Sequence, residues 1–153
     1  MPVSRAAPRL PGCGPSPGLP HALPARVPAL AGLRPTLVGV SDAQLGPEDQ
    51  KIITLARSTR ARVAAAEGAA VRDETGRTYA AAAVALPSLQ LSALRLAVAM
   101  AVSSGAATLE AAALVSDVEE PDPGDLAAVR DLGPEATVFH AAPDGTLRAA
   151  LRL

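Results

Sequence analysis

The chain has 153 residues, a length that suits one domain, and a formal net charge of −1 at pH 7. It lacks the clustered Lys and Arg that a nucleic-acid-binding surface needs, and no apolar run reaches the roughly 18 residues of a membrane span. We therefore expect no nucleic-acid partner, no membrane partner and a cytoplasmic localisation.

Residues 1–40 form a proline- and glycine-rich segment that carries four arginines and no acidic residue. Proline removes backbone donors and glycine adds backbone entropy, so we expect 1–40 to be a disordered N-terminal extension and 41–153 to form the domain. Because a valine codon can act as a bacterial start, a second hypothesis is that translation begins at Val40 and 1–40 is not part of the native protein. The segment also holds Cys13, and a lone cysteine excludes an intrachain disulfide or a cysteine cage for zinc within one chain.

A helix is predicted to begin at Pro47, since proline is favoured at the first helical position and two acidic residues follow it. Residues 68–72 and 77–84 read as two strands, and residues 73–76 supply a turn in which Gly76 adopts a positive φ. These segments predict a β-hairpin after the first helix.

The next predicted helix spans residues 89–103, with Ser88 as its N-cap and Gly105 closing it. It is apolar on nearly all sides and Arg95 is its only charge, so it is either buried or packed against another subunit. The aliphatic residues of the chain are mostly small and bury little area each, which also favours association between copies.

Strands are then predicted at residues 111–116 and 137–141, separated by a helix that ends near residues 132–133. Asp125 is the expected N-cap of that helix, and Asp122 the expected turn residue before it. A terminal strand or helix follows at residues 146–151. This alternation of helices and strands predicts a layered α/β domain.

The order and wording of these segments resemble the small, homo-oligomeric cytidine deaminase family over about residues 47–147. Residues 67–79 resemble the family's hairpin "G-A-A-L…D-G-R-x-Y", and residues 92–95 resemble "C-A-E-R" at the start of its catalytic helix. Residues 125–133 resemble the helix after its second zinc motif, and residues 138–145 its last core strand and turn. The resemblance implies a three-layer α/β/α fold with a mixed central sheet.

The same resemblance implies that the catalytic residues are absent. The family's zinc ligand and proton-shuttling Glu in "(C/H)-A-E" fall on Ser92 and Leu94, and both cysteines of "P-C-x-x-C" fall on Asp122 and Asp125. A neutral serine hydroxyl is a poor zinc ligand and leucine carries no proton. We expect no zinc, no other cofactor and no catalytic residue, so the chain would be a degenerate member of the family.

Substrate contacts are expected to be missing too, because the ribose-binding positions of the family's "N-x-E-N" fall near Ala83 and Ala85. Arg95 is expected to pair with Asp122 or Asp125, so that a structural salt bridge stands where the metal stood. Two alternatives stay open: Arg95 points to the surface without a partner, or the oxygens of positions 92, 122 and 125 form a weak Mg²⁺ or Ca²⁺ site. His140 is expected to be a packed or edge residue of a strand rather than a base.

The resulting functional hypothesis is a catalytically inactive cytidine deaminase-like protein with an interaction or regulatory role. Its expected partners are further copies of itself, in a homodimer or homotetramer, and an unidentified protein. Two alternatives stay open: a hydrolase of the deaminase family with a nonstandard site, and a nucleoside-binding module without turnover. Fold resemblance alone does not decide between them.

Overall fold

A computed structural model describes residues 36–38 and 45–153, and the predictions for 1–35 and 39–44 lie outside the described residues. The helices are α1 (Pro47–Arg62), α2 (Ala93–Ser103) and α3 (Pro123–Leu132). The strands are β1 (Thr36–Val38), β2 (Glu67–Asp73), β3 (Thr78–Ala82), β4 (Val84–Leu86), β5 (Leu89–Leu91), β6 (Leu109–Ser116), β7 (Thr137–Ala141) and β8 (Leu147–Arg152).

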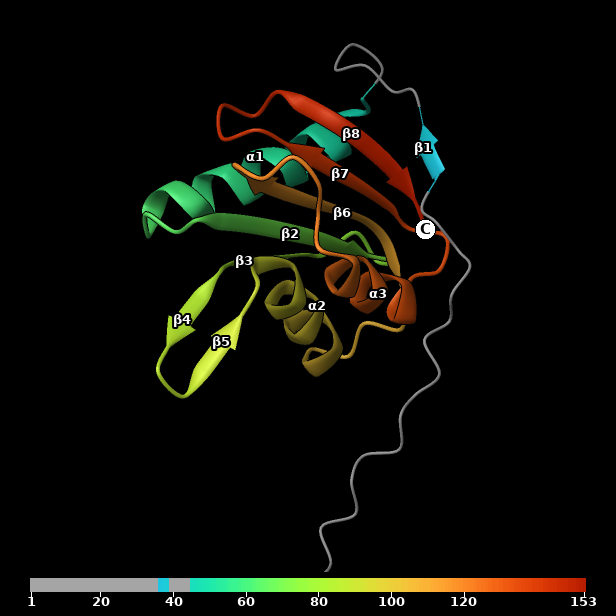
Figure 1. Ribbon diagram of the computed structural model, residues 1–153. Coiled ribbons are helices and arrows are strands. Elements are labelled where there is room, and N and C mark those ends of the chain that lie inside the picture. Colours follow the sequence, from blue (N-terminus) through green and yellow to red (C-terminus); the bar gives the residue numbers. More distant parts are fainter. Residues whose placement is uncertain (1–35, 39–44) are drawn as a thin grey trace, which may run out of the picture. The chain divides into compact units, whose positions relative to one another are not determined.

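Six strands form one sheet in the order β1-β8-β7-β6-β2-β3. Strands β6 and β7 are parallel because α3 crosses over between them, and every other neighbouring pair in this sheet is antiparallel. The predicted mixed central sheet is therefore confirmed. Strands β4 and β5 pair only with each other and form a separate hairpin (Figure 1).

The helices cover both faces of the sheet (Figure 1). On one face, Ile52, Ile53 and Ala56 of α1 pack in a cluster that includes Phe139. On the other face, α2 and α3 share a second cluster with the strands, to which they contribute Leu94, Val98, Leu126 and Val129. The three-layer α/β/α arrangement is thus confirmed, with one helix on one side and two on the other.

Helix α1 lies unusually close to the sheet because β2 carries Gly68 beneath it. A Cβ atom at Gly68 would lie 2.2 Å from the carbonyl oxygen of Ala56 and 2.7 Å from the Cβ of Arg60. Only glycine allows this approach. The predicted start of the helix at Pro47 is confirmed, and Arg60 and Arg62 lie in its last turn, where the helix dipole favours cations.

The predicted hairpin of β2 and β3 is confirmed, and Asp73 holds its turn together. Asp73 is buried, with 1% of the residue exposed. Its carboxylate accepts hydrogen bonds from the backbone N–H groups of Thr75 and Arg77 and from the hydroxyls of Thr75 and Tyr79. Burial alone would raise the pKa of Asp73, but these donors outweigh it and lower the pKa. Gly76 adopts a φ of +81° in the same turn, as predicted.

Helix α2 begins four residues later than predicted, and this expectation was wrong. Residues Leu89–Leu91 alternate in the strand period and pair with β4, so Ser88 lies in a hairpin turn rather than at a helix N-terminus. The N-cap is Ser92, whose Oγ accepts a hydrogen bond from the backbone N–H of Arg95. Gly105 follows the helix with a φ of +88°, as expected for its closing residue.

Two further expectations were wrong, and a third, which left the terminal segment open between strand and helix, is decided. Residues Thr36–Val38 form β1 and pair antiparallel with β8, although the sequence predicted disorder through residue 40. The N-cap of α3 is Asp122 rather than Asp125, because the helix begins at Pro123 and its first positions include Asp125. The terminal segment is a strand, β8. Within the described residues, no helix is long and apolar enough to cross a membrane.

Candidate functional site

The N-termini of α2 and α3 come together at the positions that the sequence singled out. Ser92 caps α2 and Asp122 caps α3, where its Oδ1 accepts the backbone N–H of Gly124 at 2.8 Å. Arg95, in the first turn of α2, reaches across to α3. Its Nη2 lies 3.2 Å from Asp122 Oδ1 and its Nε lies 2.8 Å from Asp125 Oδ1. One guanidinium therefore contacts both aspartates.

Asp125 is the buried centre of this arrangement, with only 4% of its side chain exposed. Its Oδ1 also accepts a hydrogen bond from the Ser92 hydroxyl at 2.9 Å. The carboxylate thus receives one neutral and one charge-assisted donor, which is the way that a buried carboxylate is stabilised. We call Ser92, Arg95, Asp122 and Asp125 the helix-bridging network.

The guanidinium of Arg95 occupies the space directly above the start of α3. A Cβ atom at Gly124 would lie 2.2 Å from Arg95 Nη2 and 2.9 Å from Asp122 Oδ1. Glycine at this position leaves room for the arginine. The side chain of Arg95 is still 48% exposed, so water reaches its outer edge and its pairing with the 64% exposed Asp122 is correspondingly weak.

The other positions that the sequence singled out, Leu94, Ala83 and Ala85, carry apolar side chains and take no part in the helix-bridging network. Leu94 is 0% exposed and belongs to the hydrophobic cluster beneath α2. Ala83 is half-buried against the same cluster, and Ala85 is exposed on β4, opposite Gln90 of β5. None of these three side chains carries a hydrogen-bonding or titratable group, so none supplies acid–base chemistry or binds a sugar hydroxyl.

The donor set at this site does not suit zinc. Zinc sites in proteins are built mainly from His nitrogen and Cys sulfur, whereas this cluster offers one hydroxyl and two carboxylates that already share a guanidinium. A bound cation would also have to displace the positive charge of Arg95. Within residues 36–38 and 45–153, no three His, Cys, Asp or Glu side chains lie together in a metal-binding group.

The structure also reveals a contact that the sequence did not show, between Ser116 on β6 and His140 on β7. Both residues are 0% exposed, and Ser116 Oγ lies 3.0 Å from His140 Nε2. The other ring nitrogen, Nδ1, is buried without a hydrogen-bond partner. A nucleophile that substrate cannot reach, with no acid orienting its histidine, is not a catalytic dyad. His140 is therefore a packed strand residue.

Burial, reinforced by the positive charge of Arg148, lowers the pKa of His140. As the pH falls below about 6.5, the unfolded chain protonates this histidine before the folded chain does, so stability should be lost through that window. Urea unfolding between about pH 7 and about pH 5.5 measures the loss. His140→Gln should flatten this pH dependence, whereas His21→Gln should leave it unchanged because the sequence predicts disorder there. Equal slopes in the wild type and His140→Gln would contradict the prediction.

Comparison with known proteins identifies the family. The model of the family described as "Cytidine deaminase-like" matches residues 45–145, about two thirds of the chain. The chain belongs to the cytidine deaminase-like family. A search of curated proteins finds no match.

Solved structures of cytidine deaminases share the fold of this family member. The enzyme from Burkholderia pseudomallei is 22% identical, with a TM-score of 0.58 over 65% of this chain and 88% of its own. The enzyme from Mycobacterium leprae is 20% identical, with a TM-score of 0.51 over 65% and 90% of the two chains. A mutant cytidine deaminase from Mycobacterium tuberculosis is 24% identical, with a TM-score of 0.51 over 59% and 83%. At these identities the similarity shows the cytidine deaminase-like fold alone.

Proposed function

We propose that this chain is a non-catalytic member of the cytidine deaminase-like family that acts by association, with copies of itself or with another protein. The observation that carries the proposal is the buried carboxylate of Asp125, which is held by the side chains of Ser92 and Arg95. These residues lie at the two helix N-termini where the sequence resemblance places the zinc ligands of the family. In this proposal, the hydrogen bonds and ion pairs at this place hold α2 against α3 and do not bind a metal or a substrate.

The packing of Leu94 supports the same reading. The resemblance assigns this position to the glutamate that moves protons, and the leucine here points into the core with no exposed area. General acid–base catalysis requires a titratable group within hydrogen-bond reach of the substrate, and it contributes about 10²- to 10⁴-fold to the rate. Both the metal and this contribution would be lost together, which leaves the fold without the two parts of deamination chemistry.

An interaction role has support from exposed apolar side chains on the hairpin of β4 and β5 and on α2. The paired positions Val84–Leu91 and Leu86–Leu89 place four apolar side chains on one face of the hairpin, and Leu86 and Leu89 are 53% and 47% exposed. On α2, Met100 and Val102 are 39% and 54% exposed. An isolated two-stranded hairpin is at best marginally stable, so a covering partner would stabilise it.

Two measurements on the purified full-length protein test the loss of catalysis. Elemental analysis should find zinc far below one ion per chain, and cytidine and deoxycytidine should be released unchanged after long incubation. Zinc near one ion per chain together with turnover would overturn the proposal and favour a hydrolase with a nonstandard site. Calorimetric binding of cytidine without turnover would instead favour a nucleoside-binding module.

Light scattering on the same preparation tests self-association, and the mass of a single chain would contradict it.

A gain-of-function variant provides the matched control. Cysteines introduced together at Ser92, Asp122 and Asp125 would place three thiols at helix N-termini, where the dipole favours thiolates. If these are the former ligand positions, the triple variant should take up about one zinc ion per chain while the wild type takes up none. Failure of the folded triple variant to bind zinc would contradict the assigned correspondence with the family's ligands.

A further inference from the structure

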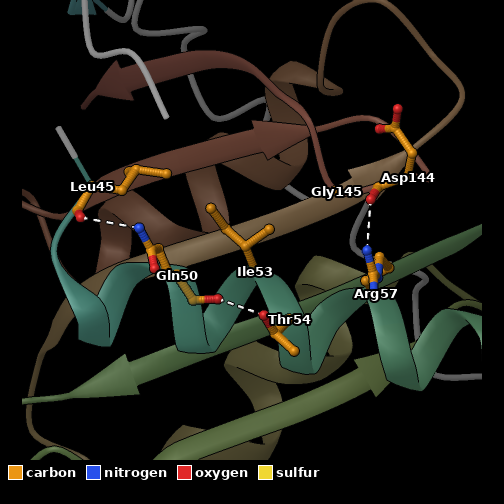
Figure 2. Close-up of a pocket in the computed structure, with 7 residues that line it drawn as sticks. All are labelled: Leu45, Gln50, Ile53, Thr54, Arg57, Asp144 and Gly145. Carbon is orange, nitrogen blue, oxygen red and sulfur yellow. Dashed lines mark hydrogen bonds between the residues drawn. The ribbon is translucent and has the colours of Figure 1, made fainter. Parts of the chain in front are cut away.

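A cavity lies on the face of the sheet opposite the helix-bridging network, between α1 and the turn that joins β7 to β8 (Figure 2). Its volume is about 260 Å³, and it opens to solvent on one side. It is lined by Leu45, Gln50, Ile53, Thr54, Arg57, Asp144 and Gly145. None of these residues belongs to the helix-bridging network, and the function proposed above does not use them.

The cavity combines an apolar wall with a polar rim. Ile53 is buried, and its side chain points into the hollow beside that of Leu45 (Figure 2). Two hydrogen bonds fix the rim on one side: Gln50 Nε2 donates to the Leu45 carbonyl at 3.4 Å, and Thr54 Oγ1 donates to the Gln50 carbonyl at 2.9 Å. The apolar wall therefore favours a short hydrocarbon group, and the rim leaves polar atoms at its edge.

Arg57 is the cation of this cavity, and it is held in place without being neutralised. Its Nη1 donates to the backbone carbonyl of Asp144 at 2.6 Å, while the Asp144 carboxylate accepts the Thr146 N–H and points away from the guanidinium (Figure 2). Gly145, with a φ of +97°, permits this approach, since a Cβ atom there would lie 3.2 Å from Arg57 Nη1.

Arg148 is likewise held by backbone carbonyls, those of Ser116 and Val118, but it does not line this cavity, and three other arginines are held by carboxylates. Arg60 pairs with Asp117 at 2.7 Å, Arg72 pairs with two carboxylates, and Arg95 belongs to the helix-bridging network. In the part of the chain that the structure describes, Arg57 forms no ion pair, and its remaining N–H groups have no acidic partner. An anchored guanidinium with free donors beside an apolar wall is a receptor for a carboxylate.

We propose that this cavity binds a small organic monocarboxylate, with the carboxylate on Arg57 and a short hydrocarbon chain against Leu45 and Ile53. A single arginine matches a single negative charge, and among the residues that the structure describes no second cation lines the cavity to balance a phosphate dianion. The volume accommodates about eight non-hydrogen atoms at roughly 30 Å³ each, the share of a water molecule in the liquid. Hexanoate has this size and carries both groups.

The test is a titration of the full-length protein with sodium hexanoate, followed by amide chemical shifts in NMR. Saturable shifts are expected at Leu45, Ile53, Arg57 and Gly145. Arg57→Gln should weaken the affinity about tenfold or more, because it removes a charge-assisted bond. Arg62→Gln removes an exposed arginine from the last turn of the same helix and should leave the affinity unchanged. Arg57→Lys keeps the charge without the planar fork, and it should retain part of the binding.

Three results would overturn the proposal. The first is the absence of saturable shifts in the folded wild-type protein. The second is equal weakening by Arg57→Gln and Arg62→Gln, which would mean that only general charge attraction is measured. The third is equal binding of hexan-1-ol, which has the chain but no carboxylate. Circular dichroism of each variant establishes that it is folded, and the zinc and turnover measurements are independent of all three results.

Discussion

Replacing Leu94 with alanine should lower the free energy of unfolding by about 2–5 kcal/mol. The leucine is fully buried in a cluster that includes Val98, Leu114 and Val138, so the shorter side chain loses its transfer free energy and leaves a cavity. Urea denaturation of both proteins, followed by circular dichroism and extrapolated to water, measures the difference.

The matched control is Leu55→Ala, the same chemical change at a half-buried position on α1. Its loss should be clearly smaller, since less apolar surface leaves water when Leu55 folds. If Leu94→Ala costs no more than Leu55→Ala, the core around position 94 is not close-packed. That outcome would contradict the proposal that a core leucine fills the position of the family's catalytic glutamate, and it would favour a pocket there.

Replacing Asp125 with alanine should lower the free energy of unfolding by about 2–3 kcal/mol, because it strands the Ser92 hydroxyl and the Nε of Arg95 together. The expected loss lies below the roughly 3–5 kcal/mol of a fully buried pair, since the half-exposed arginine can turn partly to water. Urea denaturation at neutral pH again provides the measurement.

Asp122→Ala is the comparison variant on the same helix. It removes an N-cap and an exposed ion pair, worth about 1 kcal/mol and under 1 kcal/mol respectively. A double-mutant cycle with Arg95→Ala should then give a larger coupling energy for Asp125 than for Asp122. The reverse order would show that the exposed contact, and not the buried one, ties α2 to α3, and the helix-bridging network would lose its structural role.

The parts of the fold that the sequence predicted well depend on local signals. Pro47 marked the start of α1, the residues of the Asp73 turn marked the first hairpin, and β7 was predicted with its observed bounds. The predicted start of α2 was wrong because residues 89–91, Leu-Gln-Leu, are too few for their periodicity to separate strand from helix, and only the pairing of β5 with β4 decides between them. The edge strand β1 failed because its partner, β8, is more than a hundred residues away.

The site could be predicted because the spacing of the family's motifs can be transferred to this sequence. The resemblance placed Ser92, Arg95, Asp122 and Asp125 at one point, and the structure brings all four together. Which aspartate is buried was not predictable, since an N-cap and a first-turn position differ only by the residue at which the helix begins. The Ser116–His140 contact follows from the register of the parallel strands, in which His140 is opposite Leu114, two residues before Ser116. The cavity at Arg57 could not be predicted, because it forms only where the turn at Gly145 lies against α1, far away in the sequence.

Thirteen of the twenty-six buried hydrophobic residues that the structure describes are alanines. The layers of this domain are consequently held by proximity of backbones rather than by long interlocking side chains, as at Gly68, where helix and strand nearly touch. Enlarging a buried alanine forces neighbouring side chains off their rotamers or shifts the backbone. Substitution in this core is therefore constrained in one direction, because a buried alanine can seldom be replaced by a residue with a larger side chain.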